Sequence, residues 1–157
     1  MISILFVCLG NICRSPMAEF VMKDLLRKQG LSDRAYIASA ATSTWEIGNS
    51  VHPGTKNKLA EHGISCKGKI ARLLTRADYN EYDLIIGMDK SNMDDMLQIM
   101  GGDPQHKLSL MLDWCGEHRD VADPWYTHDF EATWQDVLRG CNALLAHLAE
   151  KNNWSLH

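Results

Sequence analysis

Short apolar runs that alternate with amphipathic segments are the feature that most restricts the fold of this chain. The run over 2–7 is rich in β-branched residues and ends shortly before a Gly-Asn pair, which is typical of a turn. Apolar residues at helical spacing then continue to Gly30, and we interpret Ser15 and Pro16 as an N-cap and an N1 proline, the first residue of the helix. The chain is therefore predicted to begin with a buried strand, a tight loop and a helix.

The same alternation continues along the rest of the chain. The patterns predict strands over 35–41, 82–88 and 107–112, and helices over 53–62, 91–100 (with Ser91 as its cap) and 130–148. Strands that alternate with helices form parallel β-α-β units. We therefore expect an α/β fold, a three-layer sandwich with a central four-stranded parallel sheet and helices on both faces. The length of 157 residues favours a single domain over 1–157.

Composition narrows the compartment and the partners. Lys plus Arg is 16 against 20 Asp plus Glu, a formal net charge of −4, so the chain has no general positive field for nucleic acid or an anionic membrane. The five cysteines are an odd number at irregular spacings, which favours a reducing compartment over a disulfide framework. No segment has the pattern of a signal peptide or a membrane span. We expect a cytoplasmic protein, monomeric, that binds neither nucleic acid nor membranes.

The loop between the first strand and the first helix carries the chemistry, and we call residues 8–15 the anion loop. Its members are Cys8, Leu9, Gly10, Asn11, Ile12, Cys13, Arg14 and Ser15. A loop of this length can curl so that backbone N–H groups point inward, beside the positive end of a helix dipole. Gly10 and Asn11 tolerate the left-handed backbone that such curling needs, and Arg14 can grip two oxygens of a tetrahedral oxyanion. The loop is therefore predicted to bind phosphate.

A cysteine at the start of such a loop is a candidate nucleophile. The inward N–H groups and the helix dipole stabilise a thiolate at Cys8, and a thiolate is the reactive form of cysteine. Ser15 is placed to donate a hydrogen bond to that sulfur, and a simple N-cap remains its other interpretation. The predicted reaction is attack of sulfur on phosphorus.

At this point the sequence resembles a known family. The segment VCLGNICRSPMAE over 7–19 is similar to the sequence pattern of the low molecular weight protein tyrosine phosphatases. Further matching segments follow in order: Trp45, the pair Ala71-Arg72, GMDKSN over 87–92 and DPWY over 123–126. The resemblance runs from about residue 4 to about residue 150 and implies hydrolysis of phosphotyrosine in proteins through a phosphocysteine intermediate.

The resemblance implies a role for each matched residue. Cys8 matches the nucleophile, Arg14 the residue that clamps phosphate, Asn11 the loop asparagine in a left-handed conformation, and Ser15 the hydroxyl that bonds the thiolate. Asp123 matches a general acid on a loop distant in sequence, which protonates the leaving group and then activates water. Without the resemblance, an Asp-Pro pair such as this one is more simply a turn.

Aromatic residues and a second cysteine complete the implied site. Trp45, Trp125 and Tyr126 match the walls of a slot for a flat aromatic ring, although Trp125 replaces the tyrosine often found there. Cys13 matches a cysteine that forms a reversible disulfide with the nucleophile, and its other interpretation is a small buried apolar side chain. Lys69 stands where many relatives have a histidine that supports the loop.

Other functions remain to be weighed. No clustered His, Cys or Asp pattern predicts a metal site, and no cofactor is expected. Arsenate reduction on a similar loop needs closely spaced additional redox cysteines, whereas Cys66 and Cys115 are isolated. A noncatalytic phosphocysteine carrier would have no need of the acid at Asp123. The expected partners are tyrosine-phosphorylated proteins.

Overall fold

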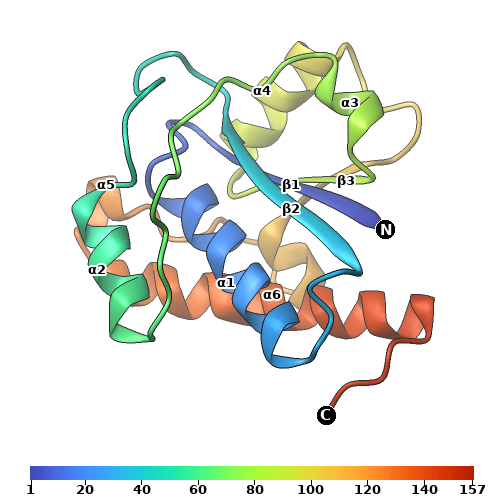
Figure 1. The fold of residues 1–157 in the computed structure, drawn as a ribbon. Coiled ribbons are helices and arrows are strands. Elements are labelled where there is room, and N and C mark those ends of the chain that lie inside the picture. Colours follow the sequence, from blue (N-terminus) through green and yellow to red (C-terminus); the bar gives the residue numbers. More distant parts are fainter.

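A four-stranded parallel sheet forms the centre of the protein (Figure 1), whose computed structural model describes residues 1–157. The strands are β1 (Ile2–Cys8), β2 (Ala35–Ala41), β3 (Leu84–Gly87) and β4 (Leu108–Leu110). Their order across the sheet is β2-β1-β3-β4, and every neighbouring pair is parallel. The predicted parallel sheet is thus confirmed, with β2 and β4 at its edges.

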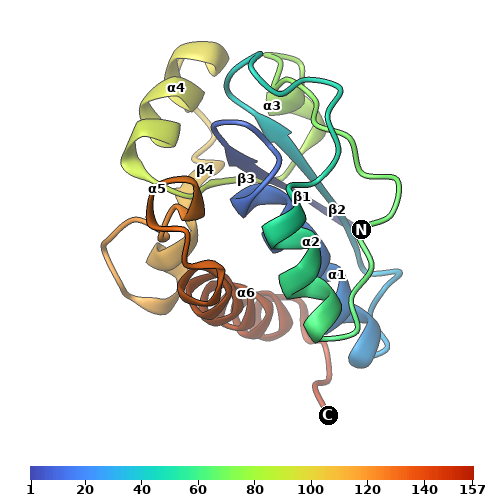
Figure 2. The ribbon, with the colours of Figure 1, turned by 90° about the vertical axis from the view of Figure 1, so that its left-hand side faces the viewer.

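Helices cover both faces of this sheet. They are α1 (Arg14–Lys28), α2 (Pro53–Glu61), α3 (Asp78–Glu81), α4 (Lys90–Met100), α5 (Pro124–Thr127) and α6 (Phe130–Asn152), together with a 3₁₀ helix, η1 (Met111–Cys115). Figure 2 shows α1, α2 and α6 on one side of the sheet and α3 and α4 on the other. The three-layer sandwich is confirmed.

The central strand β1 is buried on both faces, which explains its almost continuous apolar sequence. Ile4 and Phe6 belong to a cluster of 25 buried residues between the sheet and helices α1 and α6. Leu5 and Val7 belong to a second cluster of 9 buried residues on the face that α4 covers. All four side chains are 0 % exposed, and each such burial stabilises the fold by about 1.5–3 kcal/mol.

Two predicted helix caps are wrong. Helix α1 begins at Arg14, so Ser15 lies inside its first turn and Pro16 is its third residue rather than its first; the N-cap residue Cys13 makes no side-chain cap bond. Helix α4 is capped by Asp89 rather than Ser91, because Asp89 and Asn92 form a reciprocal capping box. Both corrections concern residues near the carboxyl ends of β1 and β3, and the Ser15 hydroxyl contacts the Cys8 sulfur instead of capping α1.

The predicted strand over 107–112 is too long. Strand β4 ends at Leu110, and η1 follows it directly. A helical turn lets the consecutive residues Met111 and Leu112 both enter the larger core, whereas a strand would place them on opposite faces. Met111 packs so closely against Gly140 of α6 that a Cβ at Gly140 would lie 2.7 Å from the Met111 Cγ.

Candidate active site

The anion loop wraps around the sulfur of Cys8, the last residue of β1. The Cys8 Sγ accepts from the backbone N–H of Asn11 at 3.3 Å and of Ser15 at 3.4 Å. The Ser15 Oγ lies 3.0 Å from the same sulfur. Cys8 is 3 % exposed and Ser15 is fully buried. Three polar groups therefore converge on one buried sulfur, beside the N-terminus of α1.

Asn11 holds the curl of the loop. Its φ is 57°, in the left-handed region that asparagine tolerates better than most residues. Its Nδ2 donates to the Ser15 Oγ at 2.8 Å, and its Oδ1 accepts from the Arg72 N–H at 3.2 Å. The left-handed conformation is as predicted, and the side chain in addition fixes the backbone around Cys8 and orients the Ser15 hydroxyl.

Arg14 is the buried cation of the site. The residue is 3 % exposed, and its Nη2 lies 2.8 Å from Asp89 Oδ2 and 3.3 Å from Asp123 Oδ2. Burial by itself lowers the pKa of Arg14, but negative charge at Cys8, Asp123 and Asp89 outweighs burial and raises it above its usual value. The guanidinium therefore stays charged and is aimed at the place where the two carboxylates and the sulfur meet.

Asp89 is a site residue for which no chemical role was predicted. It follows β3, and besides pairing with Arg14 it accepts from the Asn92 N–H at 2.7 Å as the cap of α4. Asn92 in turn accepts from the backbone N–H of Met88 and of Asp89 through its Oδ1. The segment 87–92 therefore orients Arg14 from the adjoining strand. The sequence signal for this residue is an aspartate that follows a parallel strand and caps the next helix.

Asp123 reaches the site from the other end of the chain. It is the N-cap of α5, where its Oδ1 accepts from the Trp125 N–H at 3.1 Å, while its Oδ2 faces Arg14. Its side chain is 25 % exposed. The aspartate begins a turn, as an Asp-Pro pair alone predicts, and at the same time places one carboxylate oxygen beside the anion loop.

These residues line one open cavity of about 150 Å³. The cavity is bounded by the loop residues Cys8, Leu9, Gly10, Ile12, Cys13 and Arg14, by Asp123, and by the aromatic residues Trp45, Trp125 and Tyr126. The structure thus brings all three predicted aromatic residues to the rim. Asn11 and Ser15 lie beneath the surface, where they bond to each other.

Glu46 also lines the cavity, and the sequence did not single it out. A Cβ on Gly10 would lie 3.3 Å from the Glu46 Cγ, so the two segments are closely packed there. The Glu46 carboxylate accepts from Asn49 Nδ2 at 2.6 Å. No motif marks Glu46 itself; the fold brings it over the anion loop together with its neighbour Trp45.

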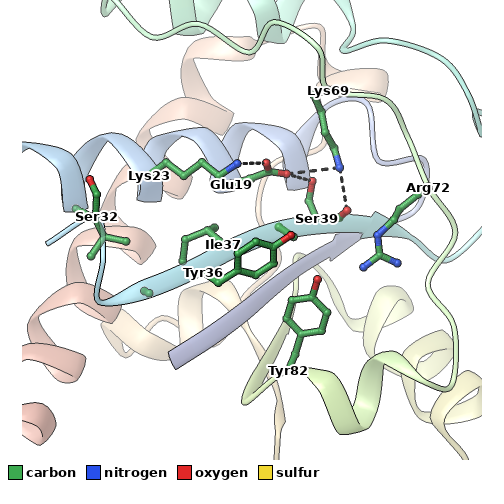
Figure 3. A pocket seen from close by; sticks show the side chains of 12 residues that line it. Glu19, Lys23, Ser32, Tyr36, Ile37, Ser39, Lys69, Arg72 and Tyr82 are labelled. Atoms are coloured by element: carbon green, nitrogen blue, oxygen red, sulfur yellow. Dashed lines mark hydrogen bonds and ion pairs between the residues drawn. The ribbon is translucent and has the colours of Figure 1, made fainter. Parts of the chain in front are cut away.

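Lys69 lies outside the cavity, at the open edge of β2 (Figure 3). Its Nζ donates to the Ser39 carbonyl at 2.9 Å and lies 3.5 Å from Glu19 Oε1. Burial lowers the pKa of Lys69, and Glu19 offsets part of that change. Glu19 also accepts from the Ser39 hydroxyl at 2.6 Å. Lys69 therefore ties β2 to α1 behind the anion loop, and the Arg72 N–H is the group that holds Asn11.

The other cysteines differ from Cys8 in their surroundings. Burial, followed by the charges of Cys8 and Asp123, raises the pKa of Cys13 to about 12. Burial also raises the pKa of Cys66, Cys115 and Cys141 above the usual range. All five cysteines are free. Cys13 is thus a protonated thiol at neutral pH, next to the loop's reactive sulfur.

No group of three or more His, Cys, Asp or Glu side chains is arranged to hold a metal ion. None of the helices combines the length and the apolar character needed to cross a membrane.

Comparison with known proteins gives a consistent result. The family model described as low molecular weight phosphotyrosine protein phosphatase matches residues 3–153. The chain is 41% identical over 153 residues to the low molecular weight protein-tyrosine-phosphatase YfkJ of Bacillus subtilis, covering 96% of this chain and 98% of the relative. The crystal structure of YfkJ matches with a TM-score of 0.93 over 96% of both chains. That of SP-PTP, a low molecular weight protein tyrosine phosphatase from Streptococcus pyogenes, matches with a TM-score of 0.88 and 42% identity over 100% of both chains.

Proposed function

The chain belongs to the low molecular weight phosphotyrosine protein phosphatase family and hydrolyses phosphotyrosine in proteins, and from this premise we propose that Cys8 is the nucleophile, Arg14 the phosphate clamp and Asp123 the general acid and base. One observation carries the proposal. The Cys8 sulfur and the Arg14 guanidinium of the anion loop line the same 150 Å³ cavity as the Asp123 carboxylate, which comes from a segment far along the chain.

The first step transfers the phosphoryl group to sulfur. The Cys8 thiolate attacks phosphorus, the bond from phosphorus to the phenolic oxygen breaks, and a protonated Asp123 donates its proton to that departing oxygen. Arg14 and the inward amides of the loop balance the charge on the three equatorial oxygens. The products are a phosphocysteine and a free tyrosine side chain.

The second step returns the enzyme to its starting state. Asp123, now a carboxylate, takes a proton from a water molecule, whose oxygen attacks phosphorus as the bond to sulfur breaks. The thiolate that leaves is stabilised by the Ser15 hydroxyl, 3.0 Å from the sulfur, and by the Asn11 and Ser15 amides. Inorganic phosphate is released, and Asp123 carries the proton for the next turnover.

The rim of the cavity accounts for the preference for phosphotyrosine. Trp45, Trp125 and Tyr126 are 76 %, 58 % and 76 % exposed, so their rings are free to contact a substrate ring that enters between them. The cavity below them places the sulfur deeper than the rim. A phenyl ring is long enough to carry its phosphate to such a sulfur, whereas the side chain of phosphoserine is short.

We propose a second role for Cys13, that of a resolving thiol. A two-electron oxidant such as hydrogen peroxide converts the Cys8 thiolate to a sulfenic acid; the Cys13 sulfur then attacks that sulfur, a disulfide forms and water leaves. Both cysteines belong to the anion loop and line the same cavity, which supports this role. The raised pKa of Cys13 keeps it protonated at neutral pH.

The remaining features of the proposal concern the whole protein. We propose that residues 1–157 form one domain that works as a cytoplasmic monomer, with tyrosine-phosphorylated proteins as partners and neither nucleic acid nor membrane among them. Free thiols at all five cysteines and a net charge of −4 support this proposal. No cofactor is needed for either chemical step.

Turnover of an aryl phosphate by purified variants tests the assignments. Cys8→Ser is expected to abolish turnover, and Asp123→Ala to reduce it sharply while leaving substrate binding intact. Cys115→Ser, which changes a thiol outside the cavity, serves as the matched control and retains activity. Normal turnover in Cys8→Ser would refute the mechanism. A stable phosphocysteine without release of phosphate would favour a carrier, and thiol-dependent reduction of arsenate would favour a reductase.

A further inference from the structure

The two residues before Asp123 have every backbone polar group bonded. The Val121 N–H donates to the Met88 carbonyl at 2.9 Å, and the Val121 carbonyl accepts from Arg14 Nη1 at 3.2 Å. These two bonds join the segment to β3 on one side and to the phosphate clamp on the other. Position 121 is also 1 % exposed, so its peptide groups cannot exchange these partners for water without opening the structure.

Ala122 is held by two side chains of α6. Its N–H donates to Asp136 Oδ2 at 3.0 Å, and its carbonyl accepts from the Thr133 Oγ1 at 2.7 Å. Thr133 is fully buried, and Asp136 is 5 % exposed. Both backbone polar groups of Ala122, the residue before Asp123, are therefore fixed to one helix by side chains one turn apart on the same face.

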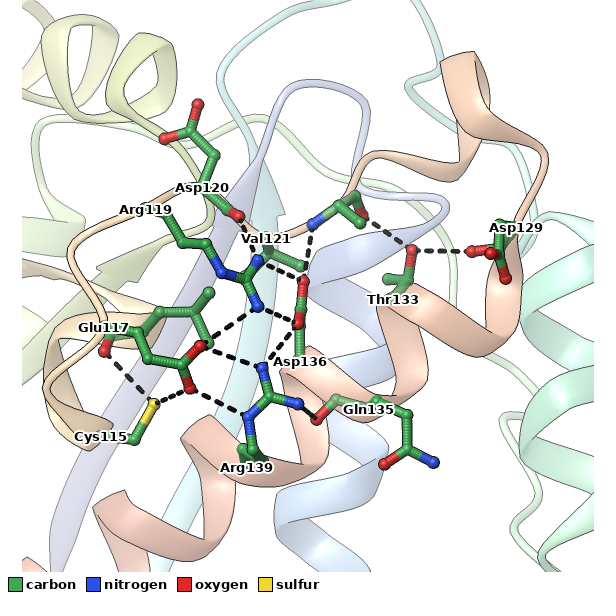
Figure 4. A network of polar contacts seen from close by, with 12 residues as sticks. Cys115, Glu117, Arg119, Asp120, Val121, Asp129, Thr133, Gln135, Asp136 and Arg139 are labelled. Carbon is green, nitrogen blue, oxygen red and sulfur yellow. Dashed lines mark hydrogen bonds and ion pairs between the residues drawn. The ribbon is translucent and has the colours of Figure 1, made fainter.

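Two arginines orient the carboxylate that makes this contact (Figure 4). Arg119 contacts both oxygens of Asp136, at 2.7 and 3.0 Å, and Arg139 donates to Oδ1 at 2.9 Å. Glu117 accepts from both arginines and so completes the cluster. A bidentate pair leaves the carboxylate little rotational freedom, so its bond to the Ala122 N–H has a defined direction.

Beyond Ala122 the chain is more exposed. We call residues 123–129 the acid loop; Trp125 and Tyr126 are exposed, and the loop ends at Asp129, the N-cap of α6. The acid loop thus starts directly after Ala122, which is bonded to α6, and ends at the N-terminus of the same helix, one turn before Thr133. The position of the Asp123 carboxylate depends on the direction in which the Ala122 peptide starts the loop.

We propose that Asp136 and Thr133 are positioning residues that aim Asp123 at the leaving-group oxygen. The inference rests on the proposed role of Asp123 as the general acid. Neither residue lines the cavity, so each acts through the Ala122 peptide rather than by touching the substrate. Proton transfer needs donor and acceptor within hydrogen-bond reach, and a misplacement of about 1 Å costs up to about 100-fold in rate.

The leaving group provides a readout that loss of stability does not move. Phenyl phosphate releases a strongly basic phenolate that needs the proton from Asp123, whereas 2,4-dinitrophenyl phosphate releases a weak base that departs without it. We expect Asp136→Asn and Thr133→Val each to lower kcat/KM for phenyl phosphate by about tenfold and for 2,4-dinitrophenyl phosphate by less than about twofold. Thr133→Val is nearly isosteric and removes the short bond to the Ala122 carbonyl at 2.7 Å together with a long contact to the Asp129 carbonyl at 3.5 Å, so it remains informative if Asp136→Asn folds poorly.

Two further variants separate the possible failures. Asp103→Asn is the matched control, because the Asp103 carboxylate likewise accepts from backbone N–H groups, those of Lys107 and Leu108, but lies outside the cavity, in the turn before β4; both substrates should be unaffected. Asp123→Asn should reproduce the leaving-group effect and remove any further effect of Asp136→Asn in the double variant. If Asp123→Asn shows no such effect, the proposed acid is wrong. If it does, while Asp136→Asn and Thr133→Val reduce both substrates equally or neither, the positioning role is refuted.

Discussion

The substitution Ser15→Ala removes the hydroxyl that contacts the sulfur of Cys8, the proposed nucleophile. The Ser15 Oγ lies 3.0 Å from the Cys8 Sγ, and both residues are buried, so no water replaces the lost partner in Ser15→Ala. A hydrogen bond to a charged group contributes about 1.5–3 kcal/mol. At about 1.36 kcal/mol per tenfold change, kcat/KM for an aryl phosphate should fall by about 10- to 150-fold.

The same substitution has a second cost in the folded state. Asn11 Nδ2 donates to the Ser15 Oγ at 2.8 Å, and Asn11 is 1 % exposed, so the amide loses its acceptor in a dry environment. An unsatisfied buried donor costs about 1–3 kcal/mol. The free energy of unfolding, measured by urea denaturation, should fall by this amount, and the loop should remain curled because the Arg72 N–H still holds Asn11 Oδ1.

Pre-steady-state kinetics distinguish loss of the thiolate partner from simple damage. The Ser15 hydroxyl also stabilises the sulfur as it leaves phosphorus, so Ser15→Ala should slow hydrolysis of the phosphocysteine and give a burst of about one p-nitrophenol per enzyme. Ser109→Ala is the control, because the Ser109 hydroxyl likewise accepts one donor, Trp114 Nε1 at 3.1 Å, but lies in β4. A folded Ser15→Ala enzyme with kcat/KM within about twofold of wild type and no burst would refute the reasoning.

Three further predictions follow from single contacts. Gly54→Ala should destabilise the fold by about 1–3 kcal/mol in urea denaturation, because its Cβ would lie 2.2–2.6 Å from three ring atoms of Phe130, and adding Phe130→Leu should recover part of the loss. Burial by itself raises the pKa of Asp136, but hydrogen bonds from Arg119 and its other donors outweigh burial and lower the pKa. The stability that the ionised carboxylate supplies is therefore present above its unfolded pKa of about 3.9 and is lost as the pH falls further. The difference in unfolding free energy between wild type and Asp136→Asn should shrink from about pH 5 to about pH 3. With a pKa of about 12, Cys13 should remain unmodified by iodoacetamide at neutral pH in peptide mapping, and its rapid alkylation would contradict its assignment as a protonated thiol.

The architecture could be predicted because each element carries its own signal. The range of β2 agrees with the prediction at both ends, and the predicted strand over 82–88 contains β3, whose ladder covers only Leu84–Gly87. Helix α3 and η1 were missed because each is a short turn fixed by tertiary contacts, such as the bidentate pair between Arg72 and Asp78 at the start of α3. Local patterns are weakest for such short elements.

The candidate site likewise has a part that local sequence predicts and a part that it does not. The loop residues are adjacent in sequence, so their convergence on Cys8 follows from one local motif. Asp89 and Glu46 come from the chain after β3 and after β2, and their place depends on strand order, which periodicity does not specify. Ser15 was given two interpretations, and the structure shows that its hydroxyl bonds the sulfur and leaves the helix without a side-chain cap.

The pairing of Arg14 supports the proposed binding of a phosphate dianion by a chain of net negative charge. Arg14 Nη2 lies between the carboxylates of Asp89 and Asp123, at 2.8 and 3.3 Å. In the proposed mechanism a phosphate that binds the guanidinium competes with Asp123 for the same donor. Asp89 is held in place as the cap of α4, so its ion pair keeps Arg14 aligned while the contact with Asp123 is exchanged for the phosphate.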